Sequence, residues 1–440
     1  MKTKPVHFIG IGGIGVSALA KLMQAEGAKV SGSDTTSSVI TRSFKNSKIS
    51  YKHKATNITK KHKLVIYSPA ISPDNPELLQ ARKLKIKTLS YPEALGAFAK
   101  KYKLIAISGS HGKSTTTAIV SLILQKNKLD PTVVIGTKLK EFGMQNFRIG
   151  KSKFLVVEAC EYKRSFLNLH PYITIITNVE TDHLDYFKDD ADYLKAFNEL
   201  AKQTTGYVVI NPNDKDSIAA TKGIKAKVVP INLKGHTLTL KDKKIHIKPG
   251  IIGGFNVTNS ALAAQAAALL GLKPLKIAKA IKFFHGTWRR MEYKKTKLKT
   301  PFIDDYAHHP TEIKATLATI RAAHPKAKIL CVYQPHQYNR THHFLGAFGA
   351  SFSDVNEVII PNIYEVRDSA SDVATVSPDD LVAEIKKNKT KASNGGGLAS
   401  TAKWLKKNHK KYGLIVTMGA GDVDRIYGWL GTPYFPNAPL

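Results

Sequence analysis

The fold is decided at residues 104–117, which read Leu-Ile-Ala-Ile-Ser-Gly-Ser-His-Gly-Lys-Ser-Thr-Thr-Thr. An apolar run typical of a buried strand leads into a glycine loop, and an amphipathic helical pattern follows. In such a unit, Lys113 can reach the terminal phosphates of ATP and the Ser114 hydroxyl can ligate Mg²⁺. The usual P-loop has glycine where this chain has Ile107, so the loop is a shortened relative of that pattern. The stretch predicts an ATP-binding strand–loop–helix unit.

A second glycine loop lies near the N-terminus, where residues 7–15 read His-Phe-Ile-Gly-Ile-Gly-Gly-Ile-Gly. Gly12, Gly13 and Gly15 would let backbone amides approach a diphosphate at the start of a helix. Asp34 follows about 20 residues later, where a ribose ligand is expected. Alone, this loop also fits an NAD-dependent dehydrogenase. An enzyme that uses ATP on a nucleotide-linked substrate needs both loops, whereas a dehydrogenase needs no ATP loop.

Strand-like and helical patterns alternate along the 440 residues, which predicts an α/β fold with mainly parallel sheets. New strands after about residue 98 and after the lysine-rich run at 294–300 suggest two boundaries. We therefore expect three domains: a Rossmann-like N-terminal domain at 1–98, a central P-loop-type ATPase domain at 99–298 and a Rossmann-like C-terminal domain at 299–440. The apolar runs are at 6–9, 64–67, 104–108, 154–157, 173–177, 207–210, 302–305, 329–333, 358–361 and 414–417.

The formal net charge of +34 makes nucleic-acid binding a class to consider. Ten of the 67 cationic residues are Arg and the other 57 are Lys, spread along nearly the whole chain. Dispersed lysine favours a solvated surface over a nucleic-acid site, because Arg usually reads phosphates and base edges. No apolar run approaches the ~20 residues of a membrane span, so we expect no membrane insertion. Two cysteines imply no disulfide framework and fit a reducing cytoplasm.

Further motifs follow in order, and together they resemble the Mur ligase family over essentially the full length. They read Gly-Ser-His-Gly-Lys-Ser-Thr-Thr at 109–116, Glu-Ala-Cys-Glu at 158–161, Thr-Asn-Val-Glu-Thr-Asp-His-Leu-Asp at 177–185, Phe-Asn-Val-Thr-Asn at 255–259, Arg-Arg-Met-Glu at 289–292, Asp-Asp-Tyr-Ala-His-His-Pro-Thr-Glu at 304–312 and Gln-Pro-His-Gln-Tyr-Asn-Arg-Thr at 334–341. The family architecture is a UDP-binding domain, an ATPase domain and an amino-acid-binding domain.

The resemblance implies an ATP-dependent ligase of peptidoglycan precursor synthesis, within the alanine-adding branch of the family. Its substrates would be UDP-N-acetylmuramate, ATP and L-alanine, and its cofactor Mg²⁺. The lactyl carboxylate would become an acyl phosphate and then an amide. A sister branch, which attaches a recycled peptide to the same sugar nucleotide, remains an alternative.

The resemblance also assigns site residues. A carboxylate, an imidazole and a hydroxyl can hold Mg²⁺ between ATP and a substrate carboxylate. The assigned sets are Ser114, Glu158 and His183 for metal; Lys113, Glu158, His183 and Arg290 for catalysis; Gly109, His111, Gly112, Lys113, Ser114, Thr115, Asn256, Asn259 and Asp305 for ATP; Gly12, Gly13, Gly15, Asp34 and Ser68 for the UDP-sugar; and Tyr306, His308, His336 and Arg340 for the amino acid.

Three positions depart from the family pattern. Ser114 replaces a usual Thr and keeps the hydroxyl, while Cys160 replaces a usual Asp between two retained glutamates. Gln337 stands where alanine-adding members usually have Arg, which removes a charge-assisted contact to an amino-acid carboxylate. Glycine or L-serine therefore remain alternative acceptors. A non-catalytic nucleotide- or nucleic-acid-binding protein also stays open, and the sequence does not specify an oligomeric state.

Overall fold

The computed structural model describes residues 4–183, 185–366 and 368–432, which form two compact units. Among these residues, unit 1 comprises 4–250 and 256–285, and unit 2 comprises 251–255 and the residues from 286 to 432. Within the described ranges, no helix is both long and apolar enough to cross a membrane.

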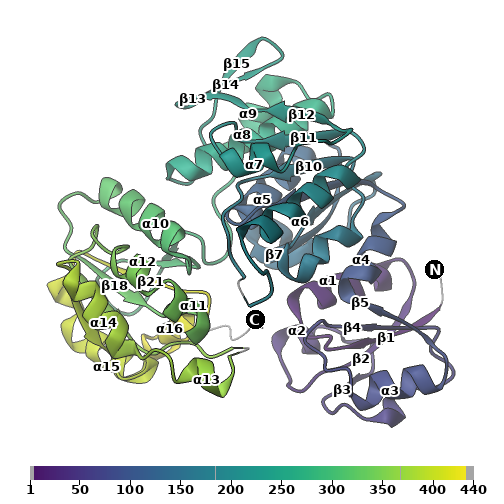
Figure 1. Cartoon of the computed structure of the whole chain (residues 1–440), viewed down its shortest axis with the longest axis horizontal. Helices are drawn as coiled ribbons and strands as arrows, with labels where there is room; N and C mark the ends of the chain where they lie inside the picture. Colours follow the sequence, from purple (N-terminus) through teal and green to yellow (C-terminus); the bar gives the residue numbers. More distant parts are fainter. Residues whose placement is uncertain (1–3, 184, 367, 433–440) are drawn as a thin grey trace. The chain divides into compact units, whose positions relative to one another are not determined.

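The first sheet of unit 1 is wholly parallel, in the order β3-β2-β1-β4-β5 (Figure 1). This is the strand order of a Rossmann-like half, in which ligands bind beyond the carboxyl ends of the strands. Its elements are β1 (Pro5–Ile9), α1 (Ile14–Ala25), β2 (Lys29–Ser33), α2 (Val39–Arg42), β3 (Ile49–Ser50), η1 (Ala55–Asn57), β4 (Leu64–Tyr67), α3 (Pro76–Lys83), β5 (Lys87–Ser90) and α4 (Tyr91–Ala99).

The second sheet has the order β12-β11-β10-β6-β9-β7-β8, and only the β7–β8 pair is antiparallel. The four residues of β10 are all buried, as expected for a parallel strand covered on both faces. Its elements are β6 (Lys103–Ser108), α5 (Lys113–Lys126), β7 (Thr132–Leu139), η2 (Lys140–Phe142), β8 (Gln145–Arg148), β9 (Phe154–Glu158), η3 (Tyr162–Asn168), β10 (Ile173–Ile176), α6 (Asp190–Gln203), β11 (Tyr207–Ile210), α7 (Lys215–Ala219) and β12 (Lys227–Pro230).

One hydrophobic core serves both sheets of unit 1. Phe8 of β1 and Phe98 of α4 belong to the same buried cluster as Leu155 of β9 and Phe166 of η3.

A small antiparallel sheet and two helices follow the second sheet: β13 (Asn232–Lys234), β14 (Thr237–Leu240), β15 (Lys243–His246), α8 (Gly254–Leu269) and α9 (Pro274–Ile281).

Unit 2 is built on one six-stranded sheet, in the order β16-β17-β21-β18-β19-β20, in which only β16 is antiparallel. Its elements are β16 (Glu292–Lys294), β17 (Phe302–Asp305), α10 (Pro310–Ala323), β18 (Ile329–Tyr333), α11 (Tyr338–His343), α12 (Leu345–Gly349), β19 (Glu357–Ile360), α13 (Ala370–Val373), α14 (Pro378–Lys387), β20 (Lys391–Asn394), α15 (Leu398–Asn408), η4 (His409–Lys411), β21 (Leu414–Met418), η5 (Val423–Arg425) and α16 (Ile426–Trp429).

The predicted α/β class with mainly parallel sheets is confirmed, and each predicted apolar run coincides with a strand to within one residue at its end. The boundary expected at 298–299 falls between β16 and β17, which pair in the sheet of unit 2. The lysine-rich run after β16 therefore connects two strands of one sheet. The division into 1–98, 99–298 and 299–440 stays a prediction.

Candidate functional site

The loop at 109–112 lies between β6 and α5, at the carboxyl edge of the second sheet. Gly112 is the N-cap of α5 and has φ +82°, a region in which side chains are strained. A Cβ on Gly112 would also lie 2.6 Å from Asn259 Oδ1. The loop therefore needs glycine here both for its conformation and for the approach of α8.

Lys113 is held in a buried ion pair. Its Nζ donates to Glu161 Oε1 at 2.9 Å and to the carbonyl oxygens of Gly109 and Ser110 at 2.6 and 3.0 Å. Burial works to lower the pKa of Lys113, but the neighbouring Glu161, Cys160 and Glu158 together outweigh it, with Glu161 contributing most, and the pKa rises to about 12. The ammonium is thus fully charged and lies at the start of α5, where phosphate oxygens would be recognised.

Glu161 also faces His183. Burial acts to raise the pKa of Glu161, but Lys113 and then His183 lower it overall. His183 Nε2 lies 3.6 Å from Glu161 Oε1, and His183 has φ +57° at the loop that follows β10. Lys113 and His183 are therefore brought together through one carboxylate.

Ser114 and Glu158 are in direct contact, with Ser114 Oγ donating to Glu158 Oε1 at 2.8 Å. The other oxygen, Glu158 Oε2, accepts from the amide of Gly136 at 2.7 Å. A hydroxyl and a carboxylate at one place form the oxygen-rich set that Mg²⁺ prefers. Glu161 Oε2 is buried with no hydrogen-bond partner, which is a further free acceptor near Lys113. These residues fit a magnesium site.

The loop is fixed from the carboxyl end of β10. Asn178 Oδ1 accepts from His111 N at 2.9 Å, and His111 Nε2 lies 3.0 Å from Glu180 Oε2. Thr115 is buried in the first turn of α5. Asn256 and Asn259 are both buried on α8, with Asn259 beside Gly112. The assigned ATP residues of unit 1 thus gather around one loop.

The first glycine loop has its own anchor. Asp34 Oδ2 accepts from Gly12 N at 2.8 Å, and Asp34 Oδ1 accepts from Thr35 N at 2.8 Å. A Cβ on Gly12 would lie 2.7 Å from Asp34 Oδ2. Asp34 therefore fixes the conformation of the loop, whereas the sequence had indicated only a ribose ligand at this position. Ser68 lies against Gly10 at the neighbouring strand end.

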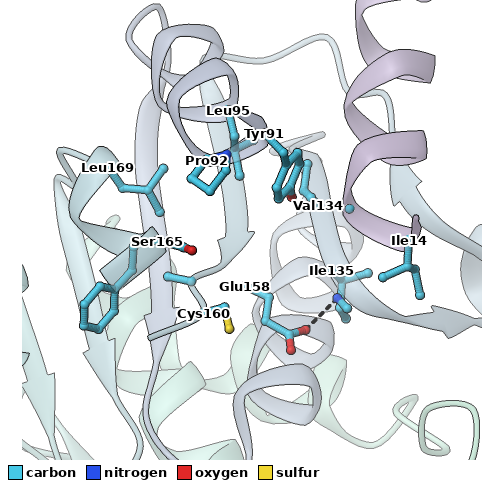
Figure 2. Close-up of a pocket in the computed structure, with 14 residues that line it drawn as sticks. Ile14, Tyr91, Pro92, Leu95, Val134, Ile135, Glu158, Cys160, Ser165 and Leu169 are labelled. Atoms are coloured by element: carbon cyan, nitrogen blue, oxygen red, sulfur yellow. Dashed lines mark hydrogen bonds between the residues drawn. The ribbon is translucent and has the colours of Figure 1, made fainter. Parts of the chain in front are cut away.

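A cavity of about 270 Å³ extends from the first glycine loop to the end of β9 (Figure 2). Ile14 and Gly15 of the first loop line it, as do Glu158 and Cys160 at the end of β9. Tyr91 of α4 is also part of the wall, and a Cβ on Gly15 would clash with its ring. Figure 2 shows the Glu158 carboxylate with its bond to Gly136 among mostly apolar side chains. The cavity offers a carboxylate-lined end near Ser114 and an apolar wall.

Unit 2 carries the remaining assigned residues. Arg289 is almost fully buried, and it donates to Asp304 Oδ2 at 3.0 Å and to the carbonyls of Gly419 and Gly421 at 2.7 and 2.8 Å. Its neighbour Arg290 is partly exposed. Its guanidinium lies 3.5 Å from Glu312 Oε1 and 5.2 Å from the centre of the Tyr306 ring. Arg289 anchors the segment, and Arg290 presents its charge beside Tyr306.

Asp305 is buried at the end of β17. It accepts hydrogen bonds from Met291 N at 2.8 Å and Ala307 N at 2.9 Å. Burial raises the pKa of Asp305 to about 6 despite the opposing charge of Arg290. The carboxylate thus fixes two loops of unit 2, in addition to the nucleotide role assigned from sequence.

The four residues assigned to the amino acid lie together in unit 2. The rings of Tyr306 and His308 are 5.7 Å apart, those of His308 and His336 are 6.0 Å apart, and His336 Nδ1 lies 3.2 Å from Arg340 Nη1. Tyr364 stacks on His336 at 5.7 Å with nearly parallel rings. These residues form a cluster of aromatic and cationic groups.

Gln337 is the N-cap of α11 with φ +73°, and its Nε2 donates to Val366 O at 3.3 Å. Sequence reasoning gave no site role to Glu161, Asn178, Tyr91 or Tyr364. The spacing Glu-Ala-Cys-Glu was a signal for Glu161, because residues just past a parallel strand gather at the ligand edge. Tyr364 lies in an irregular segment and reaches His336 through an isolated bridge, so no periodic pattern marked it.

Three protein-family models match successive parts of the chain. Residues 5–103 match "Mur ligase family, catalytic domain", 107–268 match "Mur ligase middle domain" and 289–421 match "Mur ligase, glutamate ligase domain". The chain belongs to the Mur ligase family. This membership confirms the resemblance that the ordered motifs indicated.

Two curated relatives that match over nearly the full chain share one name. The UDP-N-acetylmuramate–L-alanine ligase of Acetivibrio thermocellus is 39% identical over 97% of this chain and 95% of its own length, and that of Clostridium botulinum is 37% identical over 97% of both chains. The crystal structure of UDP-N-acetylmuramate–alanine ligase from Thermotoga maritima is 26% identical with a TM-score of 0.78, covering 96% of this chain and 97% of the other. A murein peptide ligase from Psychrobacter arcticus, 20% identical with a TM-score of 0.71 and covering 97% of this chain and 98% of its own, shares the fold.

Proposed function

We propose that this Mur ligase is an ATP-dependent enzyme that joins L-alanine to the lactyl carboxylate of UDP-N-acetylmuramate in peptidoglycan precursor synthesis. One observation carries the proposal. The cavity is lined at one side by the first glycine loop and at the other by Glu158, which bonds Ser114 of the ATP loop. A sugar nucleotide held by its diphosphate at the first loop would place its carboxylate toward the triphosphate.

The reaction proceeds in two steps. The lactyl carboxylate attacks the γ-phosphate of ATP, which releases ADP and leaves an acyl phosphate. The amine of the amino acid then attacks the acyl carbon, inorganic phosphate leaves, and an amide remains after the amine gives up its proton. The chain's contribution is mainly positioning and charge neutralisation. Lys113 supplies a permanent positive charge for the phosphates, because its pKa of about 12 keeps it protonated.

Ser114, Glu158 and His183 would hold Mg²⁺, which when bound would neutralise charge on the reacting phosphate and carboxylate oxygens. Glu161 holds the ammonium of Lys113 in place beside the loop. Asn256 and Asn259 are proposed to contact adenine, with His111 and Thr115 lining the ATP loop. The apolar wall of the cavity restricts water, which matters because an acyl phosphate hydrolyses readily.

For unit 2 we propose that Tyr306, His308, His336 and Arg340 bind the amino acid, and that Arg290 and Asp305 serve the nucleotide. Gln337 donates its amide to Val366 O and so supplies no charge for the amino-acid carboxylate. Arg340 is then the cation of that cluster proposed for this role. We also propose a cytoplasmic location, since both cysteines are free thiols and both nucleotide substrates belong to that compartment.

The test is phosphate release from ATP with UDP-N-acetylmuramate and Mg²⁺ across L-alanine, glycine, L-serine and a short peptide. We expect L-alanine to stimulate release most. Stimulation by the peptide alone would assign the chain to the peptide-attaching branch, and no stimulation by any acceptor would refute the ligase. Lys113→Ala should abolish release while leaving UDP-sugar binding nearly unchanged, whereas Lys222→Ala, at an exposed lysine of unit 1, should match the wild type.

A further inference from the structure

The outward face of α9 combines lysines with exposed apolar side chains. Ile277, Ala280 and Ile281 are buried, and the helix packs against β15 and α5 (Figure 1). Leu275, Lys276 and Lys279 are exposed on the other side of the helix, because positions three and four apart share one side. Lys282 and Phe283, directly after the end of α9, are exposed as well. We call this set the α9 face; it consists of Leu275, Lys276, Lys279, Lys282 and Phe283.

The two apolar members are unusually open. Leu275 is 77% exposed and Phe283 is 45% exposed. Lys126, from the end of α5, places its Nζ 4.6 Å from the centre of the Phe283 ring and so adds a fourth cation. Phe283 therefore carries an ammonium group over its ring.

The stretch of sequence that contains α9 carries formal charge of one sign. Residues 243–291 contain seven lysines and two arginines but no Asp or Glu, in a chain with 33 acidic residues. The lysine density is ordinary for this protein, so the missing carboxylates are what distinguish the segment. Lys273 is the N-cap of α9 and Lys276 lies in its first turn, where acidic residues would be favoured by the helix dipole. Local helix stability does not account for this charge pattern.

We propose that the α9 face docks the protein reversibly on an anionic phospholipid surface. Lysines are attracted to the acidic headgroups, and apolar side chains among them can enter the headgroup boundary. Nucleic acid is a poorer match, because the α9 face has no Arg and because a phosphate backbone provides no apolar surface that an exposed Leu could contact. A second copy of the chain is disfavoured by like charge. This inference goes beyond the proposed ligase reaction.

The experiment is co-sedimentation of the full chain with vesicles of phosphatidylglycerol and phosphatidylcholine, or of phosphatidylcholine alone. The combined change Lys276→Glu, Lys279→Glu and Lys282→Glu should weaken partitioning to the acidic vesicles about a hundredfold, since each lysine near such a surface contributes roughly a fivefold factor. The matched control changes three exposed lysines of α15, Lys403→Glu, Lys406→Glu and Lys407→Glu, and should lose far less.

Leu275→Ser keeps the charge and should weaken partitioning by roughly tenfold if the side chain enters the headgroup boundary. Phosphate release with soluble substrates should be unchanged in all variants, which also verifies their folding. Equal losses for the α9 and α15 variants would overturn the proposal, because general charge would then explain the binding. Wild-type binding to neutral and acidic vesicles alike would also overturn it, as would an α9 variant that loses duplex DNA binding but keeps vesicle binding.

Discussion

Replacing Glu161 with Gln tests the buried pair on which the ATP loop depends. The side chain of Glu161 is 1% exposed and that of Lys113 is 15% exposed, so the pair is largely screened from water. Glutamine keeps the shape of the side chain and removes its charge. Lys113 would then lose its charged partner and keep the carbonyl oxygens of Gly109 and Ser110.

Two estimates give the magnitude. The rise in the pKa of Lys113 from 10.5 to about 12 corresponds to about 2 kcal/mol of folding free energy. Breaking a buried ion pair by removing one partner costs about 3–5 kcal/mol, and the two remaining acceptors favour the lower end. We therefore expect Glu161→Gln to lower the free energy of unfolding of unit 1 by about 2–3 kcal/mol at pH 7.

The difference between wild type and variant should depend on pH at both ends. The raised pKa of Lys113 gives stability that is present below 10.5 and lost as pH rises through about 12. The lowered pKa of Glu161 gives stability that is present above the ordinary glutamate pKa and lost as pH falls through its folded value. The gap between the two proteins should thus be widest near neutral pH.

Urea unfolding can follow the two units separately. All three tryptophans, Trp288, Trp404 and Trp429, lie in unit 2, so their fluorescence reports that unit while far-UV circular dichroism reports both. Glu161→Gln should shift the dichroism transition and leave the fluorescence transition in place. Glu199→Gln removes a partly exposed partner of an arginine and should cost less than about 1 kcal/mol. Equal effects of the two substitutions would refute the reasoning.

Three further predictions concern the other parts of the candidate site. Gly112→Ala should weaken ATP binding at least about tenfold in calorimetry, because of backbone strain at φ +82° and the contact with Asn259. The control is Gly143→Ala, which introduces strain at φ +64° but meets open space, and it should leave ATP binding unchanged. Asp305→Asn should flatten the pH dependence of tryptophan-monitored unfolding between about pH 4 and 6. A carboxyl pKa raised to about 6 makes wild-type unit 2 lose about 3 kcal/mol of unfolding free energy as pH rises through that window. An unaltered profile would exclude Asp305 as the source of this pH dependence. Tyr364→Ala should raise the KM for the amino acid roughly tenfold by removing the ring stacked on His336, with little change in the KM for ATP.

Much of the fold was predictable because parallel strands covered on both faces appear as continuous apolar runs. The runs at 104–108, 173–177 and 414–417 are of this kind, and all lie in sheet centres. Edge and antiparallel strands gave no such signal. In β20 only Ala392 is buried, and the buried residues of β14 alternate with threonines.

The candidate site followed from sequence where motif and strand end coincide. The motifs predict Ser114 and Glu158 as ligands of one metal ion, and the structure brings their oxygens to 2.8 Å. Sequence reasoning could not supply contacts made across distant segments. The bond from Gly12 to Asp34 and the anchoring of Arg289 by Gly419 and Gly421 depend on chain folding that no local spacing encodes.

The shared core of unit 1 limits how the chain can be cut. Gly96 of α4 packs so closely on η3 that a Cβ there would clash with Asn168 O, and Phe98 is buried in the same cluster as Phe166. A fragment ending near residue 100 would expose the apolar surface of α4 to water. Such a fragment should aggregate during expression. The first glycine loop is therefore best studied in a protein that also contains the ATP loop.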